Sequence, residues 1–426
     1  MIKTERKISV AELELGMYVA RLDRPWVETH FLFQGFHISN DQDIRELRET
    51  CEYVYVDPEC DEIDYRRPRL KTITAEEHSD SRLRTRVASR MNERLEAILG
   101  APPPREFYPV STAVENEIPV ARESHRQTVE VISTLVGEVK AGKTIELDSV
   151  RETVGGMIAS IVRNPDAFLW LTRLKNKDAY AYMHCVDACG LSVAFGRYLG
   201  FSRTDLENLA IGTLLFDIGK LQLPDSLLKK PGRLTDPELE LIRRHVEFGV
   251  DIVKEMQGVN KDIISIILNH HERHDGSGYP RGLAGRKIPV KARIAALVDC
   301  YDAIISDRAY SSAISSYDAI QVLYESRDKD FQADIVEQFI QCVGLYPTGT
   351  LVELSNGEVG LVLAQNRVRR LRPRVMLVLR QDKSAYDFNP ILDLIEDPVD
   401  ENGTLVEIRQ PLPPGSYGIS AADYYL

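Results

Sequence analysis

Residues 270–280 read His-His-Glu-Arg-His-Asp-Gly-Ser-Gly-Tyr-Pro, so two adjacent imidazoles stand directly before a glycine-rich turn. The apolar residues before them, such as Ile263 and Ile267, recur at helical spacing and predict a helix. His270 and His271 continue that pattern and are expected on its buried face. Buried imidazoles need strong polar partners, and a metal ion is one, because neutral imidazole nitrogens suit iron, manganese, zinc or nickel. The stretch therefore predicts a metal site at a helix end, beside a turn that lets a phosphate approach closely.

Length and charge limit the classes of partner. The chain has 426 residues, enough for two or three folded units, and a formal net charge of -12. This acidic balance argues against a nucleic-acid polymer, because such a partner needs a broad basic surface. A small anionic ligand remains compatible where positive charge is local, as it is at a metal ion.

The cysteines and the apolar segments bear on location. The six cysteines show neither the paired framework of secreted proteins nor a Cys-x-x-Cys knuckle, which fits a reducing cytoplasm. The N-terminus lacks a signal peptide, and no apolar stretch of about 18 residues occurs. We therefore expect a soluble cytoplasmic protein without a membrane span.

Local patterns divide the chain into four regions. Residues 1–65 read as a small α/β module, and the proline-bearing residues 66–120 read as a linker that holds one helix. Helical periodicity dominates residues 121–346, whereas residues 347–426 alternate like strands and predict a small β extension. The arginine run at 367–374 in this extension reads as a solvated face, with a phosphate or partner contact as the alternative. The expected fold class is mainly α.

Several elements have definite expected bounds. The expected helices lie at 9–16 and 41–50, and another begins with a capping box at 235–238 and extends to 253. The expected strands lie at 17–22, 53–56, 349–354, 359–364 and 374–379.

Histidines and carboxylates gather in the helical region. Five of the nine histidines fall between positions 184 and 274, together with Asp217 in the run Phe-Asp-Ile-Gly-Lys and with Asp299. Imidazoles and carboxylates from different helices of a bundle build two-metal sites. Such a site suits phosphodiester hydrolysis, because a metal lowers the pKa of a bound water and cations neutralise the phosphoryl oxygens.

These residues resemble the HD-GYP phosphodiesterases. The resemblance covers about residues 121–346 and rests on His184, Asp217 with Gly219 and Lys220, His245, His270, His271, the Asp-Gly-x-Gly-Tyr-Pro run at 275–280, Asp299, and shorter runs at 223–225, 230–235 and 307–310. The N-terminal module resembles the uncharacterised domain that often precedes HD-GYP domains. The resemblance implies an HD-type phosphohydrolase bundle that hydrolyses cyclic di-GMP to linear pGpG, with further cleavage to GMP left open. Some members also cleave the mixed cyclic GMP-AMP dinucleotide. The implied cofactor is a two- or three-metal centre, often of iron or manganese.

The metal ligands that the resemblance implies form two groups that share one carboxylate. The first group is His184, Asp217 and Asp299. The second group is His245, His270 and His271, with Asp217 as the bridge.

The resemblance also implies catalytic and substrate-binding residues. Lys220 would assist Asp217 at the scissile phosphate, and Arg308 would hold a ligand phosphate with its planar guanidinium. The loop residues Gly278, Tyr279 and Pro280 would shape the guanine pocket. From the residues alone, Lys220 is equally compatible with a surface lysine, Arg308 with a structural ion pair, and the loop glycines with an ordinary turn.

Three positions depart from the pattern of the family. Phe216 replaces the histidine of the name-giving His-Asp pair and cannot ligate a metal. Tyr180 stands where three-metal members carry a glutamate, and Ser311 stands where a basic residue is frequent. We therefore expect one or two ions and a weakened first site, while His274, which is near enough to bend toward the gap, is more simply interpreted as facing solvent.

Three hypotheses about function follow. The first is a cyclic di-GMP phosphodiesterase, which the second ligand group motivates. The second is a sensor that binds a metal or the nucleotide without turnover and acts on a partner such as a diguanylate cyclase, which Phe216 motivates. The third is a hydrolase for another phosphoester, because other helical metal-dependent phosphohydrolases use the same combination of imidazole and carboxylate ligands.

Overall fold

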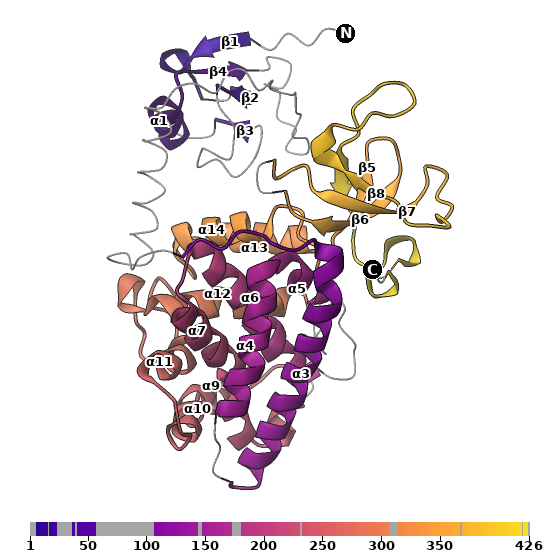
Figure 1. The fold of residues 1–426 in the computed structure, drawn as a ribbon. Coiled ribbons are helices and arrows are strands. Elements are labelled where there is room, and N and C mark those ends of the chain that lie inside the picture. Colours follow the sequence, from indigo (N-terminus) through magenta and orange to yellow (C-terminus); the bar gives the residue numbers. More distant parts are fainter. Residues whose placement is uncertain are drawn as a thin grey trace. The chain divides into compact units, whose positions relative to one another are not determined.

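The computed structural model describes residues 6–15, 17–23, 36–38, 41–56, 106–143, 147–172, 180–230, 232–306, 314–366, 369–419 and 421–424. The chain divides into two compact units (Figure 1). Unit 1 is Met1–Ala97 with Arg367–Leu371, and unit 2 is Ile98–Asn366 with Arg372–Leu426. Arg308, Ser311, the side chain of Tyr180 and the helix expected in the linker lie outside the described residues.

Unit 1 contains a four-stranded antiparallel sheet with one helix. The strands are β1 (Arg6–Ser9), β2 (Tyr18–Leu22), β3 (Phe36–His37) and β4 (Tyr53–Val56), in the order β1-β4-β2-β3, and the helix is α1 (Asp41–Thr50). Ile44 and Leu47 of α1 pack into one apolar core with Val19 and Val54 of the sheet. The expected α/β module is confirmed, although the sequence pattern did not predict β1 or β3.

The helix expected at 9–16 is wrong, because only a 3-10 turn, η1 (Val10–Glu12), forms there. The Ser9 hydroxyl accepts the amide of Ala11 at 3.3 Å, and this contact closes a tight turn rather than a capping box. Leu13 then returns to an extended conformation with φ -70° and ψ 135°.

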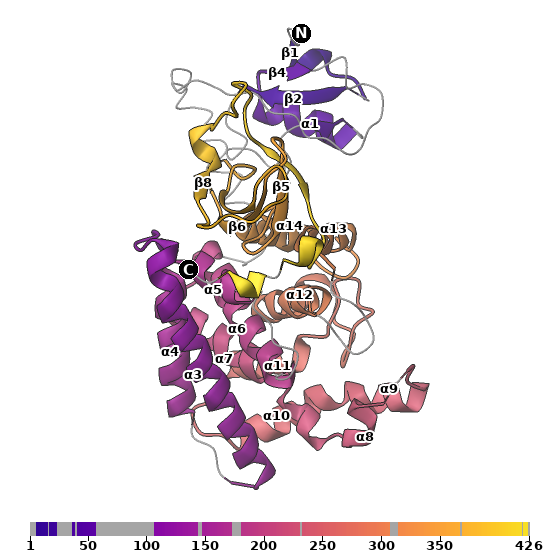
Figure 2. The same ribbon diagram turned by 90° about the vertical axis from the view of Figure 1, so that its right-hand side faces the viewer.

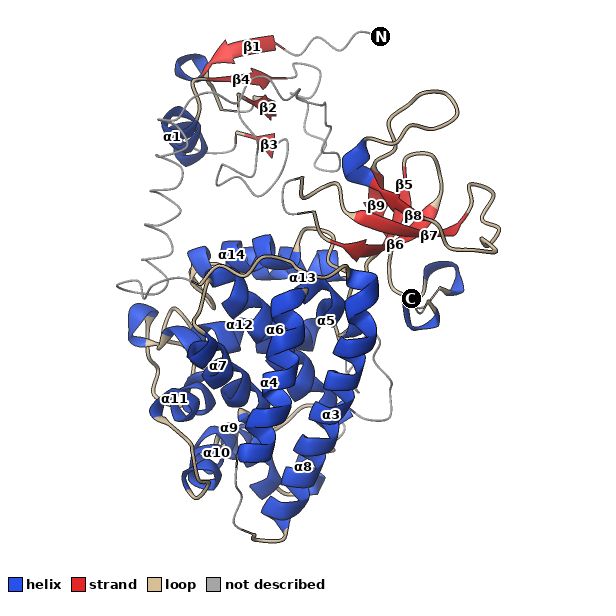
Figure 3. Ribbon diagram, viewed as in Figure 1, coloured by secondary structure: helices blue, strands red, loops and turns tan. Residues whose placement is uncertain are grey.

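The helices of unit 2 pack around α6, most of whose described residues are buried (Figure 3). In chain order they are α3 (Val114–Lys140), α4 (Asp148–Arg163), α5 (Pro165–Leu171), α6 (Tyr180–Leu199), α7 (Arg203–Leu215), η4 (Ile218–Gln222), α8 (Asp225–Leu228), α9 (Asp236–Arg243), α10 (His245–Lys254), α11 (Lys261–Asn269), η5 (Gly285–Lys287), α12 (Val290–Ile304), α13 (Ser316–Glu325) and α14 (Ala333–Val343). α6 contacts α3, α4, α5, α7, α12 and α14. None of the described helices is long and apolar enough to cross a membrane.

The C-terminal strands of unit 2 form an antiparallel sheet that shares a core with α3 and α5. Its strands are β5 (Leu351–Leu354), β6 (Val359–Ala364), β7 (Arg374–Leu379), β8 (Ile391–Asp393) and β9 (Ile408–Pro411), in the order β8-β7-β6-β5-β9. Val114 and Ile118 are buried in this core, so α3 begins seven residues before the expected start of the helical region.

Two arginines of the predicted solvated face are structural. Arg372 is only 1% exposed, donates to the carbonyl of Val406 at 3.0 Å and pairs with Glu407 at 2.9 Å. Arg374 pairs with Glu115 of α3 at 2.6 Å and so ties β7 to the helical body. The expectation that this run is merely solvated is therefore wrong at both positions.

The helix expected from 235 to 253 is two helices, α9 and α10, with a break at Arg244. The predicted capping box at Thr235 and Glu238 is present at the start of α9. Near the break, the carbonyl of Ile242 accepts the ring Nδ1–H of His245 at 2.8 Å. Figure 2 shows α8 and α9 projecting to one side of the helical body, whereas His245 at the start of α10 is only 1% exposed.

Candidate metal centre

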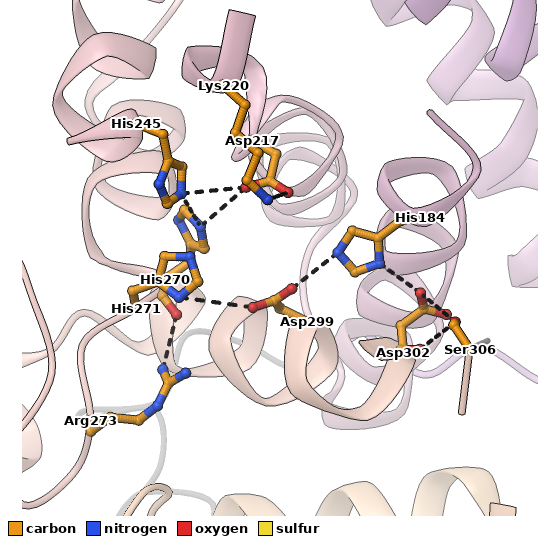
Figure 4. A network of polar contacts seen from close by, with 10 residues as sticks. All are labelled: His184, Asp217, Lys220, His245, His270, His271, Arg273, Asp299, Asp302 and Ser306. Carbon is orange, nitrogen blue, oxygen red and sulfur yellow. Dashed lines mark hydrogen bonds and ion pairs between the residues drawn. The ribbon is translucent and has the colours of Figure 1, made fainter. Parts of the chain in front are cut away.

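Four side chains converge where three helices end or begin (Figure 4). Asp217 follows α7, His245 begins α10, and His270 and His271 follow α11, and one ligand atom of each lies within 4.8 Å of the others. The Asp217 Oδ1 atom is 3.4 Å from His245 Nε2 and 3.9 Å from His270 Nε2. Ligand atoms about 2.1 Å from one metal ion would be separated by similar distances. We refer to these four residues as the convergent cluster.

Two imidazoles of the convergent cluster have a fixed tautomer. His245 Nδ1 and His270 Nδ1 each lie 2.8 Å from a backbone carbonyl, that of Ile242 and that of Ile267. A carbonyl only accepts, so both Nδ1 atoms carry the proton and both Nε2 atoms present a lone pair. The two Nε2 atoms are 3.5 Å apart. This is the arrangement by which backbone partners orient metal-binding histidines.

The charge states of the convergent cluster also suit a cation. Burial lowers the pKa of His270 to about 4 and lowers that of His245 and His271, so all three rings are neutral near pH 7. Burial would raise the pKa of Asp217, but the charge of Lys220 holds it well below its usual range. Metal binding therefore does not have to displace a proton from any of the four ligands.

Gly219 allows η4 to lie against α10 and so sets the distance between Asp217 and His245. A Cβ at this position would come within 1.9 Å of the His245 carbonyl oxygen and 2.3 Å of the Gly249 amide nitrogen. Both atoms are backbone, so neither can turn aside as a side chain would.

We expect Gly219→Ala to separate η4 from α10 and to lower stability by about 1–3 kcal/mol, as overpacking does. Metal affinity should fall with it, because Asp217 moves away from His245. Urea denaturation and metal titration check this result. The control is Gly137→Ala in α3, where nothing lies within 4 Å of the added Cβ; there we expect a gain of about 0.5–1 kcal/mol. Equal responses of the two variants would contradict the packing argument.

His184 and Asp299 lie beside the convergent cluster and belong to a second set of contacts (Figure 4). His184 donates from Nε2 to Asp299 Oδ1 at 3.0 Å and from Nδ1 to Asp302 Oδ2 at 2.7 Å. Asp299 in turn lies 4.0 Å from His271 Nδ1. Asp299 therefore connects the ring of His184 to the convergent cluster.

Phe216 occupies the space next to both sets of residues. Its ring is fully buried, stacks on His184 at a centroid distance of 5.7 Å and lies 4.8 Å from the ring of His270. A phenyl ring offers no lone pair. The first predicted ligand group therefore keeps His184, Asp217 and Asp299 but has an apolar ring where a further donor would stand.

The two carboxylates around His184 determine its charge. Burial would lower the pKa of His184, but hydrogen bonds to Asp299 and Asp302 outweigh burial and raise the pKa to about 10. Because the pKa is raised above 6.5, the charged ring stabilises the metal-free fold below pH 6.5, and this stabilisation is lost as the pH rises through about 10.

Asp302→Asn should weaken this pH dependence. We expect metal-free wild-type protein to lose on the order of 2 kcal/mol more stability than the variant as the pH rises from near neutral to alkaline values. Urea denaturation of both proteins across that range measures the difference. Parallel stability profiles would show that Asp302 does not hold the charge of His184.

The glycine-rich loop packs onto the convergent cluster. The buried carboxylate of Glu272 accepts the amides of Arg281 at 2.9 Å and Leu283 at 2.8 Å. The ring of Tyr279 stacks on His271 at a centroid distance of 4.7 Å and an interplanar angle of 23°. A Cβ on Gly278 would come within 2.5 Å of the His271 carbonyl oxygen, so only glycine fits there.

The structure places most of the predicted site residues together and adds two. Lys220 donates to Asp217 Oδ2 at 2.5 Å, and Pro280 follows Tyr279 in the loop. His274 is partly buried outside the convergent cluster, where it lines a small cavity. Sequence reasoning missed Asp302 and Glu272, although Asp302 lies three residues after Asp299, a spacing that puts both carboxylates on one face of α12.

Comparisons with known proteins identify two domain families in the chain. The HD domain family matches residues 169–335, and the domain of unknown function DUF3391 matches residues 5–150. Members of the HD domain class are phosphohydrolases that bind divalent metals, and the convergent cluster lies inside the matched segment.

Individual relatives indicate a more specific class of phosphohydrolase. The cyclic di-GMP phosphodiesterase PA4108 of Pseudomonas aeruginosa is 34% identical over 372 residues, 87% of this chain and 84% of that protein. The response regulator RpfG of Xanthomonas campestris pv. campestris, also named a cyclic di-GMP phosphodiesterase, is 38% identical over 34% of this chain and 38% of its own length. The 3'3'-cGAMP-specific phosphodiesterase 2 of Vibrio cholerae is 33% identical over 33% of this chain and 27% of that protein. The chain therefore belongs to the HD-GYP family of cyclic di-GMP phosphodiesterases, which confirms the resemblance drawn from the sequence.

Proposed function

We propose that this chain is a metal-dependent phosphodiesterase that hydrolyses cyclic di-GMP to linear pGpG. The observation that carries the proposal is the convergent cluster, in which three neutral imidazoles and an ionised carboxylate face one point. The relative that covers most of the chain bears the name of this activity. Further cleavage to GMP and hydrolysis of the mixed cyclic GMP-AMP dinucleotide are secondary expectations, and the second has a named relative.

The convergent cluster would hold one divalent cation, with iron or manganese as the expected metal because its donors are imidazole nitrogens and a carboxylate oxygen. A cation there supplies a nucleophile that is active near neutral pH and neutralises charge on the phosphoryl oxygens. Phe216 disfavours a second ion at His184 and Asp299, because it offers no donor.

Lys220 would place a positive charge beside the scissile phosphate. The Lys220 side chain is 40% exposed, and its ammonium group donates to Asp217 Oδ2; Asp217 raises the pKa of Lys220 against the effect of burial. The charged lysine thus holds Asp217 as an acceptor while keeping further N–H groups for a phosphate oxygen. Arg308 stays a prediction as a second phosphate contact.

A sensor without turnover is the second candidate, and the buried position of Phe216 favours it. Losing one half of a two-metal clamp removes several kcal/mol of transition-state stabilisation, and about 1.4 kcal/mol is tenfold in rate. Such a protein would bind the nucleotide and pass its state to a partner, for which a diguanylate cyclase domain remains our proposal.

A cytoplasmic location and domain limits at residues 65, 120 and 346 remain predictions from the sequence.

The decisive experiment separates turnover from binding. Purified protein, freed of metal and reloaded anaerobically with iron or aerobically with manganese, is incubated with cyclic di-GMP, and products are followed by chromatography. Formation of pGpG that requires the added metal supports the phosphodiesterase. Calorimetric binding of cyclic di-GMP without product supports the sensor, and neither binding nor product contradicts both.

A further inference from the structure

Arg243 is a partly exposed cation that contacts the edge of the convergent cluster through one aromatic ring. It is the last residue of α9, two positions before His245. Its guanidinium carbon lies 5.3 Å from the centroid of the Tyr279 ring, and that ring stacks on His271. A continuous line of contacts therefore leads from a surface cation to a metal-binding histidine.

Arg243 contributes little to the stability of the fold. Its ion-pair partner is Glu240, 2.5 Å away, and the two side chains are 41% and 68% exposed. An exposed pair of this kind contributes little to stability because water and salt screen it. None of the residues of α9 is buried, so Arg243 does not anchor a packed helix either. Stability alone thus does not explain why the guanidinium lies over Tyr279.

Three other described arginines near the loop are engaged elsewhere. Arg244 lies over the ring of Phe248 at 4.7 Å, Arg273 donates to the carbonyl of His270 at 3.3 Å, and Arg281 donates to Asn269 at 2.6 Å. Arg243 donates from one Nη atom to Glu240, which leaves its Nε and second Nη as a fork. That fork matches two oxygens of a phosphate group.

We propose that Arg243 binds the non-scissile phosphate of the cyclic dinucleotide. The inference rests on the proposed function: a cyclic dinucleotide carries two phosphates, and when the metal takes one, the other needs a cation at the mouth of the site. Cation–π contact with Tyr279 pre-orients the guanidinium, so less side-chain entropy is lost on binding. Glu240 pairs with the remaining Nη atom, so its negative charge lies beside the bound phosphate and weakens this binding.

Steady-state kinetics with manganese-loaded protein and cyclic di-GMP test the assignment. We expect Arg243→Ala to raise KM at least tenfold while kcat stays within twofold, and Arg243→Lys to recover part of the loss. Glu240→Gln should lower KM, because it removes a negative charge beside the phosphate. Arg244→Ala is the matched control, since the neighbouring arginine stacks on Phe248, and its KM should equal that of the wild type.

The outcomes separate this inference from the proposed function. Normal wild-type turnover with an Arg243→Ala KM equal to that of Arg244→Ala overturns the assignment alone. An Arg243→Ala variant that loses kcat and bound metal together also overturns it, because Arg243 would then act through the structure of the cluster. If wild type binds but does not turn over, the same comparison is made on the Kd from calorimetry. Neither binding nor turnover in wild type overturns both.

Discussion

Replacing His270 by alanine is expected to lower the affinity for iron or manganese by more than about 100-fold and to abolish hydrolysis of cyclic di-GMP. Partners that only orient a metal ligand already change affinity 10–100-fold, so a direct ligand should exceed that range. His270 is fully buried, and its Nε2 atom faces Asp217 and His245 within 3.9 Å. The remaining donors cannot replace a central nitrogen of the cluster.

The matched control for His270→Ala is His125→Asn. His125 also lies in the helical body and pairs with the buried Asp187 at 3.1 Å, but it is outside the convergent cluster, and asparagine keeps a donor for Asp187. Metal content by mass spectrometry and product by chromatography should stay at the wild-type level in this control. Retention of metal and turnover by His270→Ala would contradict the assigned centre.

Phe216→His is expected to raise the metal content from one to two ions per chain and to increase kcat at least about tenfold, since recovering about 1.4 kcal/mol of transition-state stabilisation suffices for that factor. Histidine is smaller than phenylalanine, so it fits the pocket. The centroid of the Phe216 ring lies 5.7 Å from that of His184 and 4.8 Å from that of His270, so a histidine nitrogen there could reach a metal beside Asp217 and Asp299.

The control for this gain of function is Phe216→Leu, which stays apolar and should keep one ion. Metal content and turnover are measured on the same samples. If Phe216→His binds no further ion and gains no rate, Phe216 is not what limits the first ligand group. The one-metal interpretation of the wild type would then need another cause.

Sequence reasoning reached the parts of the fold that short-range patterns determine. Strands β6 and β7 were predicted to the residue, because each is an apolar run bounded by turn residues. Strands β8 and β9 were missed, because both are short and partly exposed, and β9 is defined by pairing with β5, which lies far away in sequence. The start of α3 was placed too late for a similar reason: Val114 and Ile118 are buried by the C-terminal sheet.

In the candidate site, too, local patterns identified some residues, whereas the role of others depends on contacts distant in sequence. His270 and His271 were identified from helical spacing before a turn, and the structure brings them together with Asp217 and His245. The role of Asp302 depends on a contact with His184, 118 residues earlier, which no local pattern reveals. The phenyl side chain of Phe216 alone shows that this residue cannot bind a metal. Its effect on the site, however, depends on which rings surround it, and the sequence does not reveal those neighbours.

Metal content and turnover, measured on one preparation of the wild-type protein, are the decisive measurement for the metal centre. We expect one iron or manganese ion per chain, bound by the convergent cluster, and conversion of cyclic di-GMP to pGpG that stops when the ion is removed. A preparation that forms pGpG with no bound metal, or that binds no metal under saturating conditions, would contradict it.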